Sequence, residues 1–198
     1  FVKEINSGNM KLYSRKDFYE GKLKASDFDF QSPIGSICQY RFFQPEDFAP
    51  RLPVLTANAA ISQKLREKYI AAGPHVDRII GISWRGGGKA GRIKQKSIDI
   101  DSFRSLIINH PNVRFVSLQY GESKKIVNAW KESGVDVIHD DNIDPMKDIY
   151  NWLSQVAACD AVVSVANTTI HGAGGLNIPT QCLLSSHADW RWIDSPEV

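Results

Sequence analysis

The residues best suited to chemistry form one short polar turn that follows an apolar run. The run, Asp160–Val165, is typical of a strand buried on both faces of a parallel sheet. Asn167, Thr168 and Thr169 are residue types that begin a helix, and small residues follow them. The first helical turn offers unpaired N–H groups and the positive end of a dipole, which favour an anion such as phosphate. His171, about one turn in, adds a hydrogen bond or a charge.

A second polar segment, residues 85–97, is a basic loop that contains no acidic residue. Its basic residues are Arg85, Lys89, Arg92, Lys94 and Lys96, and its first glycines are Gly86, Gly87 and Gly88. Glycines let a backbone approach a ligand closely. Two interpretations remain open. The turn and the loop form one diphosphate site, or they are a helix cap with a structural histidine and a solvated basic loop.

Regular elements that position these two segments alternate along the chain from residue 78 onward. Strands are predicted at 79–84, 113–118, 135–138, 160–165 and 180–184, and helices at 58–72, 101–109, 123–133 and 148–159. Helices of this length between strands imply right-handed crossovers. We therefore predict a Rossmann-like α/β fold, with a doubly wound parallel five-stranded sheet of order 3-2-1-4-5 and an irregular N-terminal extension.

The predicted strand order brings the two polar segments together. Strands one and four are neighbours in it, and such sheets bind ligands at the carboxyl ends of the strands where the order reverses. The basic loop follows strand one and the polar turn follows strand four. This convergence favours the diphosphate site over the two separate structural explanations.

Two known motifs match the basic loop only in part. The G-x-G-x-x-G spacing at 86–91 fits a dinucleotide fingerprint, but we expect no helix to start within it, and Gln119 and Tyr120 stand where an acidic residue should end strand two. Arg92 follows the last glycine where a P-loop requires lysine. The histidines show no ligand spacing with cysteines or carboxylates, so no metal site is predicted.

The composition is that of an ordinary globular chain. It has 198 residues, 42% of them hydrophobic, and a net charge of +2, which argues against a dedicated nucleic-acid binder. Three cysteines without CxxC spacing suit a cytoplasmic protein. No apolar run is long enough to span a bilayer, and no signal-peptide pattern is present. Because the sequence starts at Phe1, we expect it to be a piece of a longer protein.

Five segments in order carry a resemblance to a known family. They are G-I-S-W-R-G-G (81–87), F-V-S-L-Q-Y-G (115–121), residues 148–165, N-T-T-I-H-G-A-G-G-L-N-I-P (167–179) and D-W-R-W (189–192). Their order and spacing resemble the carboxyl-terminal half of two-Rossmann-domain glycosyltransferases that are often fused to tetratricopeptide repeats. Those enzymes are similar to the heptosyltransferases of glycosyltransferase family 9.

The resemblance implies a nucleoside diphosphate-sugar as donor and no cofactor. It implies that residues 167–171 hold the diphosphate, that Lys96 is a basic phosphate contact, and that residues 119–122 lie by the nucleoside. It also implies inverting transfer to a glycan, lipid or protein acceptor, with the catalytic base in the other half. We therefore expect this chain to bind the donor without transferring its sugar. Where the family has aspartate before the turn, this chain has Ala166.

Residues and resemblance together predict one donor site and two segments. The predicted site residues are Arg85, Gly86, Gly87, Lys96, Gln119, Asn167, Thr168, Thr169 and His171. Residues 1–57 are predicted to be the remnant of a preceding domain and a linker, and residues 58–198 the nucleotide-sugar-binding domain. The alternative function is a non-catalytic nucleotide-binding or scaffolding module.

Overall fold

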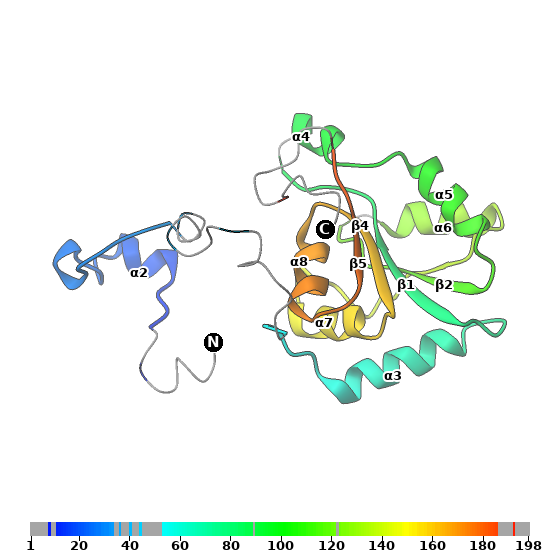
Figure 1. Ribbon diagram of the computed structural model, residues 1–198, viewed down its shortest axis with the longest axis horizontal. Helices are drawn as coiled ribbons and strands as arrows, with labels where there is room; N and C mark the ends of the chain where they lie inside the picture. Colours follow the sequence, from blue (N-terminus) through cyan, green and yellow to red (C-terminus); the bar gives the residue numbers. More distant parts are fainter. Residues whose placement is uncertain are drawn as a thin grey trace. The chain divides into compact units, whose positions relative to one another are not determined.

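The structure is a computed structural model, and it contains two compact units. It describes residues 8, 11–33, 36, 40, 44, 53–88, 90–121, 123–185 and 192. The first unit is Phe1–Arg51 and the second is Leu52–Val198. The second unit holds all the strands found in the described residues (Figure 1).

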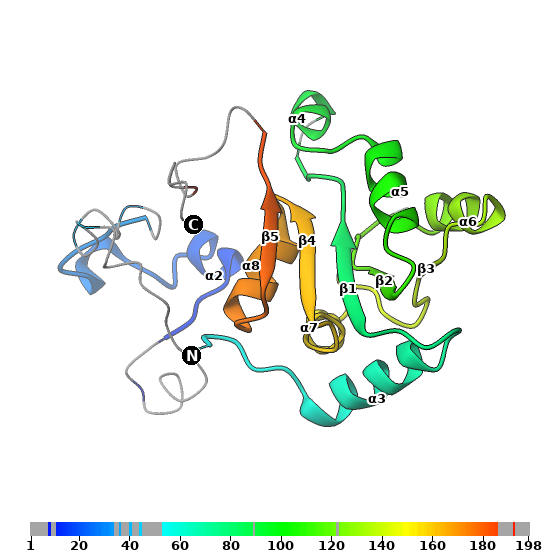
Figure 2. The same cartoon turned by 45° about the vertical axis from the view of Figure 1, so that its right-hand side comes forward.

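The second unit is built on a fully parallel five-stranded sheet. The strands are β1 (Arg78–Ser83), β2 (Val113–Ser117), β3 (Val137–Ile138), β4 (Ala161–Val165) and β5 (Thr180–Leu183). Their order is β3-β2-β1-β4-β5, as predicted, so β1 and β4 are neighbours in the middle of the sheet. Figure 2 shows the arrowheads of β1, β4 and β5 at the same end of the sheet. Ligands of such sheets bind at this end, beside the carboxyl ends of the strands.

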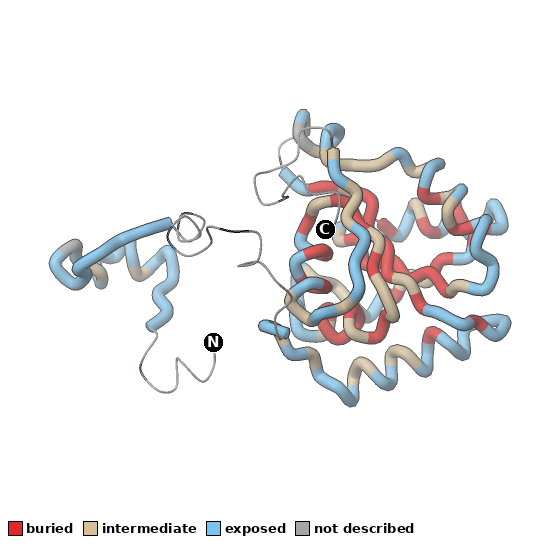
Figure 3. Tube along the Cα trace, viewed as in Figure 1, coloured by how far each residue is buried: buried red, intermediate tan, exposed pale blue. Residues whose placement is uncertain are grey.

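Helices cover both faces of the sheet, and each face has its own core. The helices on one face are α3 (Ala59–Ile70), α7 (Ile149–Ala157) and α8 (Thr168–Gly175), and those on the other are α5 (Ile100–Ile108) and α6 (Lys124–Glu132). Tyr69 and Trp152 lie in the first core, and Trp84, Phe103 and Trp130 in the second. In Figure 3 the strands are mostly buried and the outer helix faces exposed. The predicted doubly wound α/β fold is therefore confirmed.

Polar side chains hold α3 against the rest of the second unit. The buried Tyr69 hydroxyl donates to Asp140 Oδ2 at 3.1 Å and accepts from Gln155 Nε2 at 3.0 Å. Lys68 Nζ donates to the same carboxylate at 2.6 Å. Arg66 Nη1 donates to the Ala158 carbonyl at 3.0 Å. The helix that leads into the domain is thus held by buried hydrogen bonds as well as by apolar packing.

One short helix, α4 (Ala90–Gln95), contradicts the sequence analysis. It starts inside the G-x-G-x-x-G spacing at 86–91, so our expectation that no helix begins there was wrong. A helix of six residues is too short for an apolar period to reveal it. Contacts within the loop hold it instead, because Ser97 Oγ donates to the Ile93 carbonyl at 2.6 Å and accepts from the Gly86 amide at 3.1 Å. The other objection to the dinucleotide fingerprint stands, since Gln119 and Tyr120 follow β2.

The first unit has local structure that the sequence analysis did not assign. It contains α2 (Arg15–Tyr19) and a 3-10 turn, η1 (Ala25–Asp27). A capping box starts α2, because Ser14 Oγ accepts from the Asp17 amide at 3.1 Å and Asp17 Oδ2 accepts from the Ser14 amide at 2.8 Å. None of the residues of α2 is buried. The predicted connecting chain between residues 33 and 53 lies mostly outside the described residues.

Two cysteines in the described residues are free thiols. Cys159 is buried and Cys182 is half-buried. Burial raises the pKa of the Cys159 thiol to about 12 and that of Cys182 to about 11. Neither therefore has the thiolate character of a reactive cysteine. Cys38 lies outside the described residues.

In the described part of the chain, no helix has both the length and the apolar character needed to cross a membrane.

The Lys68–Asp140 contact makes stability depend on pH in a defined direction. Burial raises the pKa of Asp140, but hydrogen bonds from Lys68 and the Asn142 amide, with the Lys68 charge, hold it below its usual value of 3.8. Ionised Asp140 therefore stabilises the fold above that value, and the contribution is lost as the pH falls through the folded-state pKa.

We expect Asp140→Asn to lower the free energy of unfolding by about 1–3 kcal/mol at neutral pH, because it weakens a charged hydrogen bond. The difference from the parent should shrink as the pH falls below 3.8. Urea unfolding over a pH series measures both effects. The control is Asp141→Asn, whose exposed carboxylate pairs with Lys124 and His139 and should contribute much less to stability than the buried Asp140. A constant difference for Asp140→Asn across the series would contradict this assignment.

Candidate functional site

A buried network of amides and hydroxyls joins the carboxyl ends of β1, β2 and β4. Asn167 Nδ2 donates to Ser83 Oγ at 2.7 Å and to the Arg85 carbonyl at 3.1 Å. The Ser83 hydroxyl donates in turn to Gln119 Oε1 at 3.0 Å. Predicted site residues that follow three different strands therefore lie within hydrogen-bond distance of one another, at the point where the strand order reverses.

Gln119 holds the turn that leaves β1. Its Oε1 atom also accepts from the Trp84 and Arg85 amides, at 3.1 and 2.8 Å, and its Nε2 atom donates to the Tyr120 carbonyl at 3.2 Å. The residue is buried. Because protein groups already use its amide, Gln119 positions the loop backbone and leaves little of its own side chain to a ligand.

Asn167 plays the same kind of role for α8. It caps the helix, since its Oδ1 atom accepts from the Thr169 amide at 2.8 Å. The first amides of a helix have no acceptor within the helix. With the Thr169 amide satisfied by Asn167, those of Thr168 and Ile170 remain for a ligand.

The basic loop places two cations beside this network. A Cβ built on Gly121 would lie 3.1 Å from Arg85 Nη2, so the guanidinium lies against the backbone that follows β2. A Cβ built on Gly86 would lie 2.5 Å from Lys96 Cβ, so the loop folds back and brings Lys96 to its own beginning. Among the described residues, no acidic side chain pairs with Arg85 or Lys96. Their charges therefore remain available to an anion.

A cavity of about 240 Å³ lies beside the first turn of α8. It is lined by Leu118, Tyr120, Pro145, Met146, Ile149, Trp152, Thr168 and Thr169. Two atoms of these residues, Thr169 Oγ1 and Trp152 Nε1, have no hydrogen-bond partner among the described residues, but both are covered by protein and neither is exposed to the cavity. Mostly apolar walls with a few polar residues are typical of sites for small organic ligands. The cavity therefore suits a flat, partly polar group next to the free helix amides.

The small residues of α8 serve packing. A Cβ built on Gly172 would lie 2.7 Å from Trp152 Cη2, and one on Gly175 would lie 2.6 Å from Leu55 Cδ1. The glycines thus let Trp152 form the cavity wall and let the segment before α3 dock, with the Val54 and Leu55 amides donating to the Gly175 carbonyl at 2.9 and 2.8 Å.

Gly87 and His171 are predicted site residues that contribute no hydrogen bond to the network. Gly87 is exposed, and a Cβ built on it would lie 2.5 Å from the Tyr120 hydroxyl, so the loop after β1 touches the loop after β2. His171 is exposed on α8, and its ring stacks on Trp192 with centroids 5.9 Å apart.

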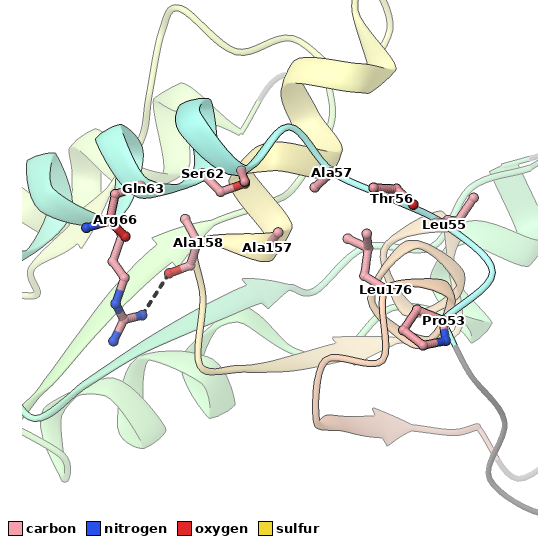
Figure 4. A pocket seen from close by; sticks show the side chains of 11 residues that line it. Pro53, Leu55, Thr56, Ala57, Ser62, Gln63, Arg66, Ala157, Ala158 and Leu176 are labelled. Carbon is pink, nitrogen blue, oxygen red and sulfur yellow. Dashed lines mark hydrogen bonds between the residues drawn. The ribbon is translucent and has the colours of Figure 1, made fainter.

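A larger, open cavity of about 450 Å³ is lined by none of the predicted site residues (Figure 4 shows its lining). It is bounded by the segment before α3, by α3 itself and by the end of α7. Its charged lining residue, Arg66, is already paired with Asp160 at 2.9 Å and bonded to the Ala158 carbonyl. This cavity offers no free charged group. Within the described ranges, no group of three His, Cys, Asp or Glu side chains could hold a metal ion.

Sequence reasoning missed two residues of the site. Ser83 interrupts an otherwise apolar strand, and that single polar residue was a usable signal. Trp152 lines the cavity beside α8, but an aromatic residue on an apolar helix face is ordinarily read as packing. Tyr120, from the loop that the resemblance places by the nucleoside, lines the same cavity, and only the fold brings it together with Trp152.

The chain is similar to Protein FlbA of Caulobacter vibrioides, with 33% identity over 166 residues. The match covers 82% of this chain and 27% of that protein, so the chain spans about a quarter of its relative's length. No protein-family model matches the chain. No solved structure matches it either.

We expect Asn167→Ala to lower the free energy of unfolding by about 1–3 kcal/mol, because the change removes a helix cap and leaves buried groups unpaired. The matched control is Thr168→Ala, whose side chain is exposed at the next position and should change stability by less than about 0.5 kcal/mol. Urea unfolding of the two variants measures the difference. Equal stability of Asn167→Ala and the parent would contradict the role given to this amide.

Proposed function

We propose that this chain is the donor-binding part of a glycosyltransferase and that it holds a nucleoside diphosphate-sugar at the carboxyl ends of β1 and β4. The observation that carries the proposal is the cavity that Tyr120, Trp152 and Thr169 help to line, directly beside the first turn of α8. One ligand with a flat polar ring joined to an anion would use both features. A nucleoside diphosphate has this form.

The diphosphate is proposed to lie over the first turn of α8. The amides of Thr168 and Ile170 have no acceptor within the helix and would donate to an anion there, and the helix dipole favours negative charge. Arg85 and Lys96 supply two charges that no described acid neutralises. Hydrogen bonds between charged partners are about twice as strong as neutral ones.

The nucleobase is proposed to enter the cavity between Tyr120 and Trp152. Apolar side chains such as Met146 and Ile149 would cover the faces of the base. The Trp152 indole N–H is a donor, and the Thr169 hydroxyl can donate or accept. Both atoms are covered in this structure, so each side chain would have to turn toward the cavity to meet the polar edge of the base, and binding would then satisfy two groups that are buried without a partner.

Transfer would break the bond between the anomeric carbon and a diphosphate oxygen, and negative charge would develop on that oxygen. Groups already in place around the diphosphate would stabilise this charge in the transition state. In this proposal those groups are Arg85, Lys96, His171 and the amides of Thr168 and Ile170. The family resemblance supports an inverting hexosyl or heptosyl transfer in the cytoplasm, to a glycan, lipid or protein acceptor, with tetratricopeptide repeats in the longer protein. The catalytic base is proposed to lie outside these 198 residues.

A non-catalytic nucleotide-binding or scaffolding module is the second candidate. Ala166, which replaces the aspartate of the family that this chain resembles, favours it. Release of nucleoside diphosphate from a sugar donor by the longer protein separates the two candidates, because a binding module would retain affinity and release nothing.

Lys96→Ala should weaken the binding of a nucleoside diphosphate by about 1.5–3 kcal/mol, the range for hydrogen bonds to charged groups. Calorimetric titration with ADP, UDP and GDP measures it. Lys94→Ala, which removes an exposed charge from the same loop, is the control and should have a much smaller effect. Equal losses for the two variants would mean that only the general charge of the loop matters.

Thr169→Val separates a ligand contact from a structural role. It removes a buried hydroxyl that has no partner, so stability should stay the same or rise, while affinity for the nucleoside diphosphate should fall by about 0.5–1.5 kcal/mol. The control is Ser117→Ala, which removes another buried hydroxyl without a partner, from a residue that does not line the cavity. Its affinity should equal that of the parent. Unchanged affinity in Thr169→Val would exclude this hydroxyl from the site.

A further inference from the structure

His171 is the predicted site residue with the least support from its own surroundings. Its side chain is exposed, and it makes no hydrogen bond or ion pair among the described residues. Its ring does have one defined neighbour, the indole of Trp192, with centroids 5.9 Å apart and planes inclined by 24°. This distance lies within the range of roughly 4.5–7 Å that is typical of offset aromatic stacks.

The stack restricts a side chain that would otherwise rotate freely. An exposed imidazole samples several rotamers, and fixing it in one of them costs entropy when a ligand binds. A neighbour that holds the ring beforehand removes part of this cost. Trp192 follows β5 in the sequence, so this stack joins it to α8, the helix that precedes that strand.

The position of His171 on α8 makes its orientation relevant to the site. Residues three apart on a helix lie on the same side. His171 is three residues after Thr168, which lines the cavity and carries one of the amides left free in the first turn. A ring held on this side of α8 is within one turn of the proposed diphosphate position.

We propose that Trp192 is a positioning residue of the donor site, whose indole holds the His171 imidazole ready to donate a hydrogen bond to the diphosphate. The inference rests on the proposed function. It assigns a role to the D-W-R-W segment (189–192) that the sequence analysis left without one. Through His171, Trp192 would act on the contact with the diphosphate of the donor and not on the contact with the nucleobase.

The test compares the binding of ADP, UDP and GDP by four variants in calorimetric titrations. Trp192→Ala and His171→Ala should each weaken binding by about 2- to 12-fold, the range that corresponds to one aromatic stack. The double variant should lose little more than either single variant, because both remove the same contact. Trp192→Phe should retain most of the affinity, since a phenyl ring can also stack. The control is Tyr150→Ala, which removes an aromatic ring that is 74% exposed and should bind as the parent does.

Proton NMR detects the stack without any ligand. An indole shifts the signals of a ring stacked on it, and His171→Asn identifies which imidazole signals belong to His171. Those signals should move in Trp192→Ala and stay nearly in place in Tyr150→Ala. If they do not move in Trp192→Ala, the stack does not exist in solution and the inference is wrong.

The two experiments keep the inference distinct from the proposed function. If the parent binds a nucleoside diphosphate and Trp192→Ala binds it equally well, the role of Trp192 is overturned while the donor site stands. If the parent binds none of the three nucleotides, the proposed function fails and takes the inference with it. Weaker binding in Trp192→Ala, together with moved His171 signals, supports both.

Discussion

The arrangement at the centre of the sheet depends on satisfying one buried side-chain amide, that of Asn167. An unpaired buried donor or acceptor costs about 1–3 kcal/mol, so its hydrogen atoms must meet acceptors and its oxygen a donor. Its Nδ2 atom donates to the Ser83 hydroxyl at 2.7 Å and to the Arg85 carbonyl at 3.1 Å, and its Oδ1 atom accepts from the Thr169 amide at 2.8 Å. Meeting all of them at once fixes the end of β1, the basic loop and the start of α8 relative to one another. Gln119 adds β2 to the same network.

The polar groups of the site form two sets: one is bonded to protein groups, and the other is left for a ligand. The side chains of Asn167 and Gln119 are buried and bonded to protein groups, so they hold the backbone in place. Thr169 Oγ1 and Trp152 Nε1 have no partner among the described residues, Arg85 and Lys96 pair with no described acid, and the Thr168 and Ile170 amides have no acceptor within α8. A preorganised site needs both sets, because groups that bind a ligand are effective only when others hold them rigidly. The glycines of α8 contribute by admitting the Trp152 ring.

The sequence was sufficient for the fold and for the convergence of the basic loop and the polar turn at one end of the sheet, but not for the contacts of each residue. Apolar runs and crossover lengths predict the strands and their order, because handedness and burial leave few alternatives. Helix α4 was not predicted, because its six residues are too few to show a helical period of apolar residues. Asn167 and Gln119 were predicted to contact the ligand, yet their amides are used by partners more than 30 residues away, as Gln119 and Ser83 show. No local pattern reveals such a contact. The pairing of Trp152 with Thr169 around one cavity likewise requires the folded chain.

The central claim is that a nucleoside diphosphate binds over the first turn of α8, and amide chemical shifts test it most directly. In a titration followed by ¹⁵N-resolved NMR, the account predicts the largest changes at the Thr168 and Ile170 amides. It predicts a smaller change at the Thr169 amide, which already donates to Asn167. Changes concentrated around Leu55, Arg66 and Leu176, the residues of the larger cavity, or no changes at all, would contradict it.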